Sequence, residues 1–98
     1  MDKSLAMIEH EKDNVATALS DLIVGDRVTL MGPGKSGVIT ASQTIPFGHK
    51  IALLAIEKGE SIVKYGEIIG RATQKITLGK HVHVHNVESL RGRGDVPK

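Results

Sequence analysis

Short aliphatic runs, separated by glycine, proline and charged residues, recur along the whole chain. Runs rich in Val, Ile and Thr that are bounded by such turn-forming residues are typical of short β-strands. The pattern predicts strands over residues 5–10, 27–31, 38–40, 50–53, 61–65, 68–72 and 80–85. Strands this short and this evenly distributed favour a mainly β domain.

One segment near the N-terminus has the spacing of a helix instead. Apolar residues recur there at i, i+3, i+4 and i+7, at Val15, Ala18, Leu19 and Leu22. Asp13 or Asn14 precedes the stripe, and either side chain can cap a helix N-terminus. The pattern predicts one short N-terminal helix over residues 14–21 that lies on the sheet.

A seven-residue phrase occurs four times: an aliphatic residue, two others, glycine, two others and a second aliphatic residue. The glycine suits a turn position with positive φ, and the aliphatic residues can anchor that turn to a core. The phrase begins at Leu22, Ile45, Ile56 and Ile76. Because these intervals are unequal, the chain is not a regular solenoid. We expect one domain over residues 1–90 with similar corners, and a flexible tail or linker over 91–98.

Composition restricts the function classes. The 98 residues include one Phe, one Tyr and no Trp, so the core must be aliphatic and stacking on nucleic-acid bases is not expected. A net charge of +2 is too small for a strong phosphate-binding surface. The absence of cysteine excludes disulfides and fits a reducing compartment. We therefore expect a cytoplasmic protein with neither a nucleic-acid partner nor a membrane partner.

The densest candidate chemistry is the run His-Val-His-Val-His-Asn at residues 81–86. Side chains of a strand alternate between its faces, so His81, His83 and His85 are predicted on one face, opposite the intervening valines. Exposed imidazoles at neutral pH can act as metal ligands, proton donors or anion contacts. The alternative is an edge strand with incidental, solvent-facing histidines.

A second cluster lies in the middle of the chain. His49 and Lys50 directly follow the corner glycine at 48, and Lys64 and Tyr65 directly precede a tight turn at Gly66. Lysine supplies a point charge and tyrosine a directional hydrogen bond, which suits an anionic, hydroxyl-rich ligand. The alternative is that both lysines are solvated and Tyr65 caps the core.

Four blocks of the sequence occur together in a known order: DNVATAL at 13–19, IPFGHKIAL at 45–53, GESIVKYGEIIGRAT at 59–73 and VHVHN at 82–86. They closely resemble the N-terminal domain of the altronate and galactarate dehydratase family over about residues 8–90. The resemblance implies a SAF-type β-clip fold. It also implies a domain that precedes a much larger catalytic domain, or a separate small subunit as in sulfolactate sulfo-lyase.

The resemblance further implies the small subunit or N-terminal domain of a sugar-acid dehydratase, a hydro-lyase that is not active without its large subunit. A divalent metal, iron or manganese, would assist β-elimination of water and be held mainly by that large subunit. The site residues implied are His83 and His85 as catalytic groups or metal ligands, with His49, Lys50, Lys64, Tyr65 and Asn86 as substrate contacts. His81 lies outside the motif and receives no role.

Other hypotheses remain beside this one. The domain could be a non-catalytic docking or binding module of such a lyase, or the small subunit of a sulfolactate sulfo-lyase. It could also be a stand-alone metal-binding protein.

Overall fold

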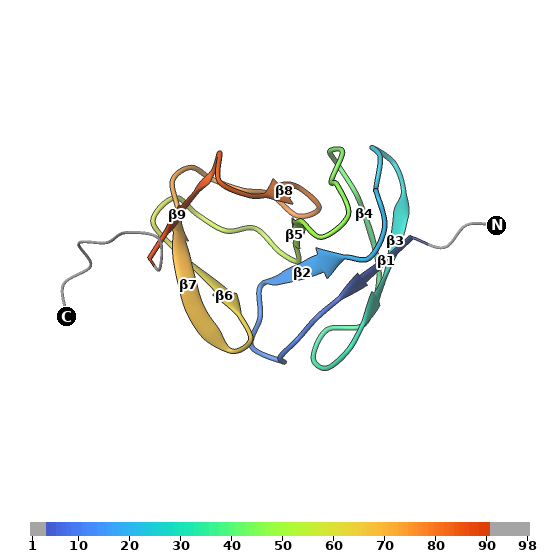
Figure 1. The fold of residues 1–98 in the computed structure, drawn as a ribbon, viewed down its shortest axis with the longest axis horizontal. Coiled ribbons are helices and arrows are strands. Elements are labelled where there is room, and N and C mark those ends of the chain that lie inside the picture. The colour runs from blue at the N-terminus through green and yellow to red at the C-terminus, as the bar shows by residue number, and fades with distance from the viewer. Residues whose placement is uncertain (1–3, 91–98) are drawn as a thin grey trace.

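The computed structural model describes residues 4–90, which form strands and turns without a helix (Figure 1). The expected mainly β fold is therefore confirmed. No helix in these residues is long and apolar enough to cross a membrane. The tail expected over 91–98 lies outside the described residues. The strands are β1 (Ser4–Met7), β2 (Val15–Ala18), β3 (Arg27–Met31), β4 (Gly37–Thr40), β5 (Lys50–Ala52), β6 (Ser61–Lys64), β7 (Glu67–Ala72), β8 (His81–Val82) and β9 (Val87–Ser89).

The strands form two sheets. The larger sheet has the order β4-β3-β1-β2-β5-β8, with β1 and β3 parallel and the other pairs antiparallel. The smaller sheet has the order β6-β7-β9 and is antiparallel. Figure 1 shows β3 and β4 at one end of the molecule, the smaller sheet at the other, and β2 and β5 between them.

The helix expected over residues 14–21 is wrong, because Val15–Ala18 form β2 between β1 and β5. Val15, Ala16 and Ala18 are all buried. A short strand that is covered on both faces is apolar at consecutive positions, and such a run also matches a helical stripe. Pairing on both sides satisfies its backbone, whereas an isolated helix of this length has too few internal hydrogen bonds to offset nucleation.

All four glycine phrases form the same turn, as expected. We call them corner 1 (22–28), corner 2 (45–51), corner 3 (56–62) and corner 4 (76–82). Their glycines have φ between 84° and 94°, a range that side chains rarely adopt. Every aliphatic residue at the two ends of the four phrases is 0% exposed. The corners are therefore anchored to the core as predicted.

An alanine four residues before each corner completes the repeat. The backbone N–H of Gly48 in corner 2 donates to the carbonyl of Ala18, and Gly25 in corner 1 donates to Ala41. Corners 3 and 4 exchange the same bonds, with Gly59 donating to Ala72 and Gly79 to Ala52. Residues 18–51 and 52–82 are thus two similar halves, and each pairs two corners reciprocally.

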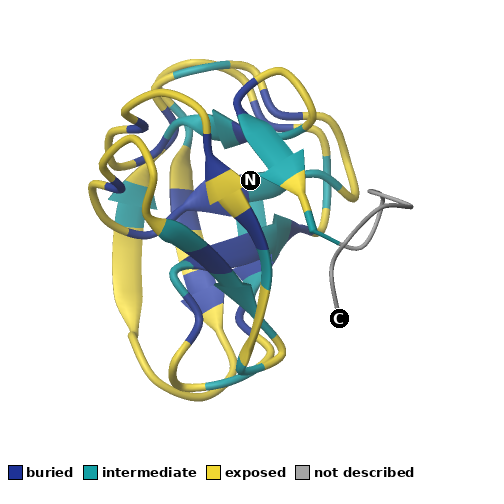
Figure 2. Cartoon of the chain, turned by 90° about the vertical axis from the view of Figure 1, so that its left-hand side faces the viewer, coloured by how far each residue is buried: buried dark blue, intermediate teal, exposed yellow. Residues whose placement is uncertain are grey.

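Each half has its own aliphatic core. Leu22, Ile45 and Ile51 belong to one cluster of buried residues, and Ile56, Ile62, Ile76 and Val82 belong to another. β2 contributes to both, because Ala16 packs in the first cluster and Val15 in the second. Figure 2 shows buried residues on several strands and many exposed residues along the turns, and β4 is mostly exposed. Functional side chains must therefore come from the corners, turns and strand edges.

Candidate active site

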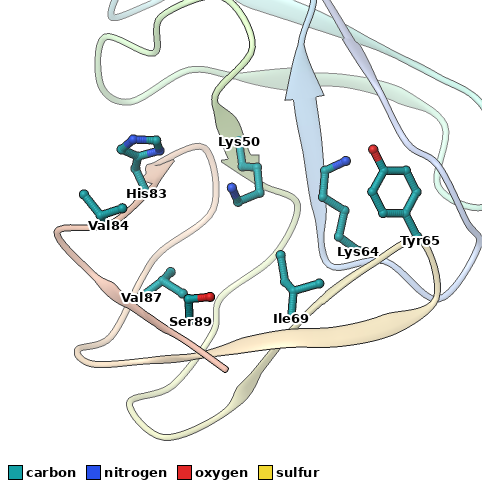
Figure 3. A pocket seen from close by; sticks show the side chains of 8 residues that line it. All are labelled: Lys50, Lys64, Tyr65, Ile69, His83, Val84, Val87 and Ser89. Atoms are coloured by element: carbon teal, nitrogen blue, oxygen red, sulfur yellow. The ribbon is translucent and has the colours of Figure 1, made fainter. Parts of the chain in front are cut away.

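A pocket of about 400 Å³ lies between β5, the β6–β7 hairpin and residues 83–89. Figure 3 shows the side chains of Lys50 and Lys64 between the His83 ring and the Tyr65 ring, with apolar residues beneath them. The lining residues are Lys50, Lys64, Tyr65, Ile69, His83, Val84, Val87 and Ser89. Residues far apart in the sequence, from both predicted clusters, therefore share one cavity.

The two lysines make this pocket cationic. Burial lowers the pKa of Lys50 from its ordinary value, and the charge of Lys64 lowers it further. The ammonium of Lys64 lies 3.7 Å from the centre of the Tyr65 ring, a cation–π contact that orients both groups. An anion placed between two cations relieves their mutual repulsion, so the electrostatics of the pocket favour an anionic ligand.

The turn that carries Tyr65 has an unfavourable backbone conformation and is fixed by hydrogen bonds to a residue far away in the sequence. Tyr65 is the one non-glycine residue with positive φ (59°) among residues 4–90, and Gly66 follows it at 75°. The buried carboxylate of Asp13 accepts hydrogen bonds from the backbone N–H groups of Tyr65 (3.1 Å), Gly66 (2.8 Å) and His10 (3.0 Å). Such a conformation persists only where its surroundings impose it. Asp13 thus positions Tyr65 in the pocket.

Asn14 acts in the same way on the strand before that turn. Its side-chain amide donates to the carbonyl of Ser61 (2.9 Å), and its side-chain oxygen accepts from the N–H of Val63 (2.8 Å). Asp13 or Asn14 was expected to cap a helix. Both side chains bind backbone groups as caps do, but apart from His10 these groups belong to the β6–β7 hairpin.

The histidine run is only partly a strand, because β8 ends at Val82 and residues 83–86 form a turn. The side chain of Asn86 is buried and closes this turn. Its oxygen accepts from the N–H of His83 (3.0 Å), and its amide donates to the carbonyl of His81 (2.8 Å). The predicted strand over 80–85 is therefore too long, since local side-chain bonds replaced the ladder after Val82.

Four imidazole rings gather at this turn. The His83 ring stacks on His49 with centroids 3.9 Å apart, and His81 lies 5.0 Å from both His49 and His85. Nδ1 of His49 and Nε2 of His81 are 2.8 Å apart and share a hydrogen bond. The antiparallel pairing of β5 with β8 brings corner 2 beside corner 4 and so creates the cluster.

Two rings of the cluster have pKa values below the ordinary value of histidine. Burial is the main cause that lowers the pKa of His81 to about 4, with further lowering by His85, His49, His83 and Lys50. Burial also lowers the pKa of His83, as do His49 and Lys50. The lowered pKa favours the neutral form of both rings, in which a ring nitrogen can ligate a cation.

The structure brings together most of the residues predicted from the sequence. Lys50, Lys64, Tyr65 and His83 line the pocket, and His49 stacks on His83. His85 contacts His81 at the far side of the cluster, and Asn86 is buried in the turn. The functional roles given to these residues stay predictions.

Two residues of the site were missed. His81 received no role, although the structure places it between three other rings. Asp13 was read only as a helix cap, although its carboxylate holds the turn of Tyr65. The period-two spacing of His81 with His83 was a usable signal for the first. Nothing in the local sequence links Asp13 to residues about fifty positions away.

One set of side chains among residues 4–90 has the geometry to hold a metal ion. His49, His81 and His83 each offer a ligand atom, and these atoms all lie within 4.8 Å of one another. The expected pair was His83 with His85. The turn at residues 83–86 changes the direction of the chain between them, so His49 from corner 2 takes the place of His85 in the set.

Comparison with known proteins identifies relatives of this chain. The chain is 45% identical to altronate dehydratase from Bacillus subtilis and 42% identical to that from Escherichia coli, each over 80 residues, or 82% of this chain. It spans only 15% of the length of those two relatives. It is also 32% identical to (2R)-sulfolactate sulfo-lyase subunit alpha from Chromohalobacter salexigens, over 90% of this chain and 98% of that relative.

The family profile of the altronate/galactarate dehydratase SAF domain matches residues 4–90, the whole part of the chain that the structure describes. The matched region includes all four corners, the lysine pocket and the imidazole cluster. The chain belongs to the altronate/galactarate dehydratase SAF domain family.

Proposed function

We propose that this chain is the SAF subunit or domain of a sugar-acid dehydratase, of the altronate type, that acts only with a large catalytic subunit. The observation that carries the proposal is the pocket in which Lys50, Lys64 and Tyr65 meet His83. The kinship to altronate dehydratases supports it, since this chain corresponds to a small part of those proteins.

The pocket suits the shape and charge of a sugar acid. The carboxylate of the substrate would lie between the ammonium groups of Lys50 and Lys64. Charge-assisted hydrogen bonds to these two groups would be its strongest interactions in the site. The hydroxyl of Tyr65 and the ring nitrogens of His49 would bind substrate hydroxyl groups. Asn86 would act with them by holding the backbone of His83 in place.

The proposed reaction is a β-elimination. A base takes a proton from the carbon beside the carboxylate, and the electron pair of that C–H bond forms the new double bond. The C–O bond of the neighbouring carbon breaks, and its hydroxyl takes up a proton from a general acid and leaves as water. His83, at the pocket wall, would serve either as the group that accepts the proton from carbon or as a ligand of the metal ion, and His85 lies exposed on the same turn. A divalent metal, iron or manganese, would stabilise the developing negative charge. The large subunit would supply the main ligands of the ion at the reaction centre, and the residues of this chain that fit a metal ion are His49, His81 and His83.

An assay of altronate dehydration tests this division of labour. The rate of altronate dehydration is measured for the 98-residue chain alone and for the chain combined with a large dehydratase subunit, in a reducing buffer near neutral pH with iron or manganese. We expect turnover only from the combination. Full activity from the chain alone would contradict the proposal.

A sulfolactate sulfo-lyase is the second candidate, favoured by the match over 98% of the alpha subunit of that enzyme. Release of sulfite from sulfolactate, measured on the same assembly, decides between the two leaving groups. A docking module without chemistry is the remaining rival. It predicts that the double variant His83→Ala/His85→Ala keeps both normal assembly and normal turnover.

A further inference from the structure

Three of the four clustered imidazoles come from two distant parts of the chain and converge on one point. His49 follows the glycine of corner 2, whereas His81 and His83 lie at the end of corner 4 and just after it. We propose that His49, His81 and His83 form a divalent transition-metal site on this chain itself, one that needs no ligand from a partner to bind the ion. His85 is not part of it.

The geometry supports a shared ion. The candidate ligand atoms lie within 4.8 Å of one another. Two nitrogens bound to one tetrahedral ion lie roughly 3.3 Å apart, because each metal–nitrogen bond is about 2.0–2.1 Å long. Side-chain rotation closes the difference. Imidazoles ligate through a nitrogen in the ring plane, so the stacked rings of His49 and His83 must turn edge-on to the ion when it binds.

The donor set has the chemistry of such a site. Three neutral imidazoles suit zinc, cobalt, nickel and iron in the divalent state, and three-histidine sites leave a further position open for water or substrate. Nδ1 of His83 is buried and has no hydrogen-bond partner in the described structure, which is costly for a nitrogen that binds nothing. A ligand role for this ring would account for that cost.

One feature of the surroundings opposes the ion. The ammonium of Lys50 acts electrostatically on both His81 and His83, and no carboxylate belongs to the triad. A cation at the triad is therefore repelled by Lys50. Removing the charge of Lys50 should therefore strengthen metal binding. The effect of Lys50 gives the test a variant that alters no ligand.

Calorimetric titration of the full chain with Co²⁺ and Zn²⁺ at pH 7.5 tests the site. We expect one ion per chain, and visible absorption of the Co²⁺ form that reports nitrogen ligands in a low-coordinate site. His49→Ala and His81→Ala should each weaken binding at least tenfold, His85→Ala should change it less than threefold, and Lys50→Gln should strengthen it. Circular dichroism of each variant shows that the fold is kept.

Two results would overturn the proposal. One is a wild-type chain that binds neither ion above the level of a surface histidine. The other is a dependence on His85 in place of His49 and His81, which would restore the pair expected from the sequence. Because the readouts are binding heat and absorption, failure of the proposed dehydratase activity leaves this test unaffected.

Discussion

Corners 1 and 3 share the backbone of corners 2 and 4 but differ in the residue that follows glycine. Asp26 in corner 1 accepts a hydrogen bond from the N–H of Ile23 (2.9 Å), and Glu60 in corner 3 accepts one from Glu57 (2.8 Å). Each acid thus closes its own turn. The corresponding residues in corners 2 and 4 are His49 and Lys80, which lie at the junction that carries the imidazole cluster.

Corner 2 shows why a histidine can replace the acidic residue after the glycine. The residue whose N–H is capped in corners 1 and 3 is Pro46 in corner 2, and proline has no N–H to satisfy. His49 is therefore released from the capping role that Asp26 and Glu60 perform. The same turn closes itself in corners 1 and 3, and in corner 2 it presents His49 to the imidazole cluster.

The largest effect is expected from the glycines of corners 3 and 4. An added Cβ at Gly59 has nothing within 4 Å, whereas at Gly79 it lies 2.3 Å from the carbonyl oxygen of Thr40 in the other half. Gly59→Ala should cost about 1–3 kcal/mol in unfolding free energy, from positive φ alone. Gly79→Ala should cost more by a further 1–3 kcal/mol or so, from overlap with backbone. Urea unfolding measures both, and equal losses would show that corner 4 does not pack as described.

The second prediction compares a variant of corner 1 that should lower stability with a variant of corner 2 that should lower turnover. Asp26→Ala removes a cap and should lower the unfolding free energy by about 1 kcal/mol, with turnover of the assembled enzyme unchanged. His49→Gln should lower turnover on the order of 100-fold, because the ring that stacks on His83 positions it, with little effect on stability. If His49→Gln behaves like Asp26→Ala, the contrast between corners 1 and 2 is not functional.

The third prediction compares a lysine of corner 2 that lines the pocket with a lysine of corner 3 that does not. Lys50→Gln should raise KM for a sugar acid about tenfold, since a charge-assisted hydrogen bond contributes about 1.5–3 kcal/mol. Lys58→Gln is the matched control, because Lys58 is exposed on corner 3 and does not line the pocket. Steady-state kinetics of the assembled enzyme measure both. A similar rise of KM for the two variants would point to general surface charge.

The smallest effect is a pH dependence of stability in metal-free protein. The pKa of His81 is about 4 in the folded chain, mainly through burial, against 6.5 as its ordinary value. Between these values the unfolded chain binds the proton more strongly, so stability falls as pH falls from 6.5 to 4. Urea midpoints measured over this range should fall less steeply for His81→Asn. An unchanged slope in the variant would show that this ring is not buried as described.

Much of the fold could be predicted because the corners are local. The glycine phrase contains both its turn residue and its anchors, so the sequence alone indicated four buried corners. β2 could not be told from a helix, since burial on both faces depends on β1 and β5. The turn after Val82 depends on bonds from Asn86, which a period-two pattern does not reveal.

The composition of the site was predictable, but its connections were not. His49 and Lys50 stand beside the glycine of corner 2, and Lys64 and Tyr65 precede a tight turn, so each pair was visible. That β5 pairs with β8, and so unites the two clusters, follows only from the fold.

The most direct test of the account is the structure of the assembled enzyme with a bound sugar acid. The account predicts that the substrate carboxylate contacts Lys50 and Lys64 and that the His83 ring faces the substrate. A structure in which the imidazole cluster points into bulk solvent, away from the bound sugar acid, would contradict it.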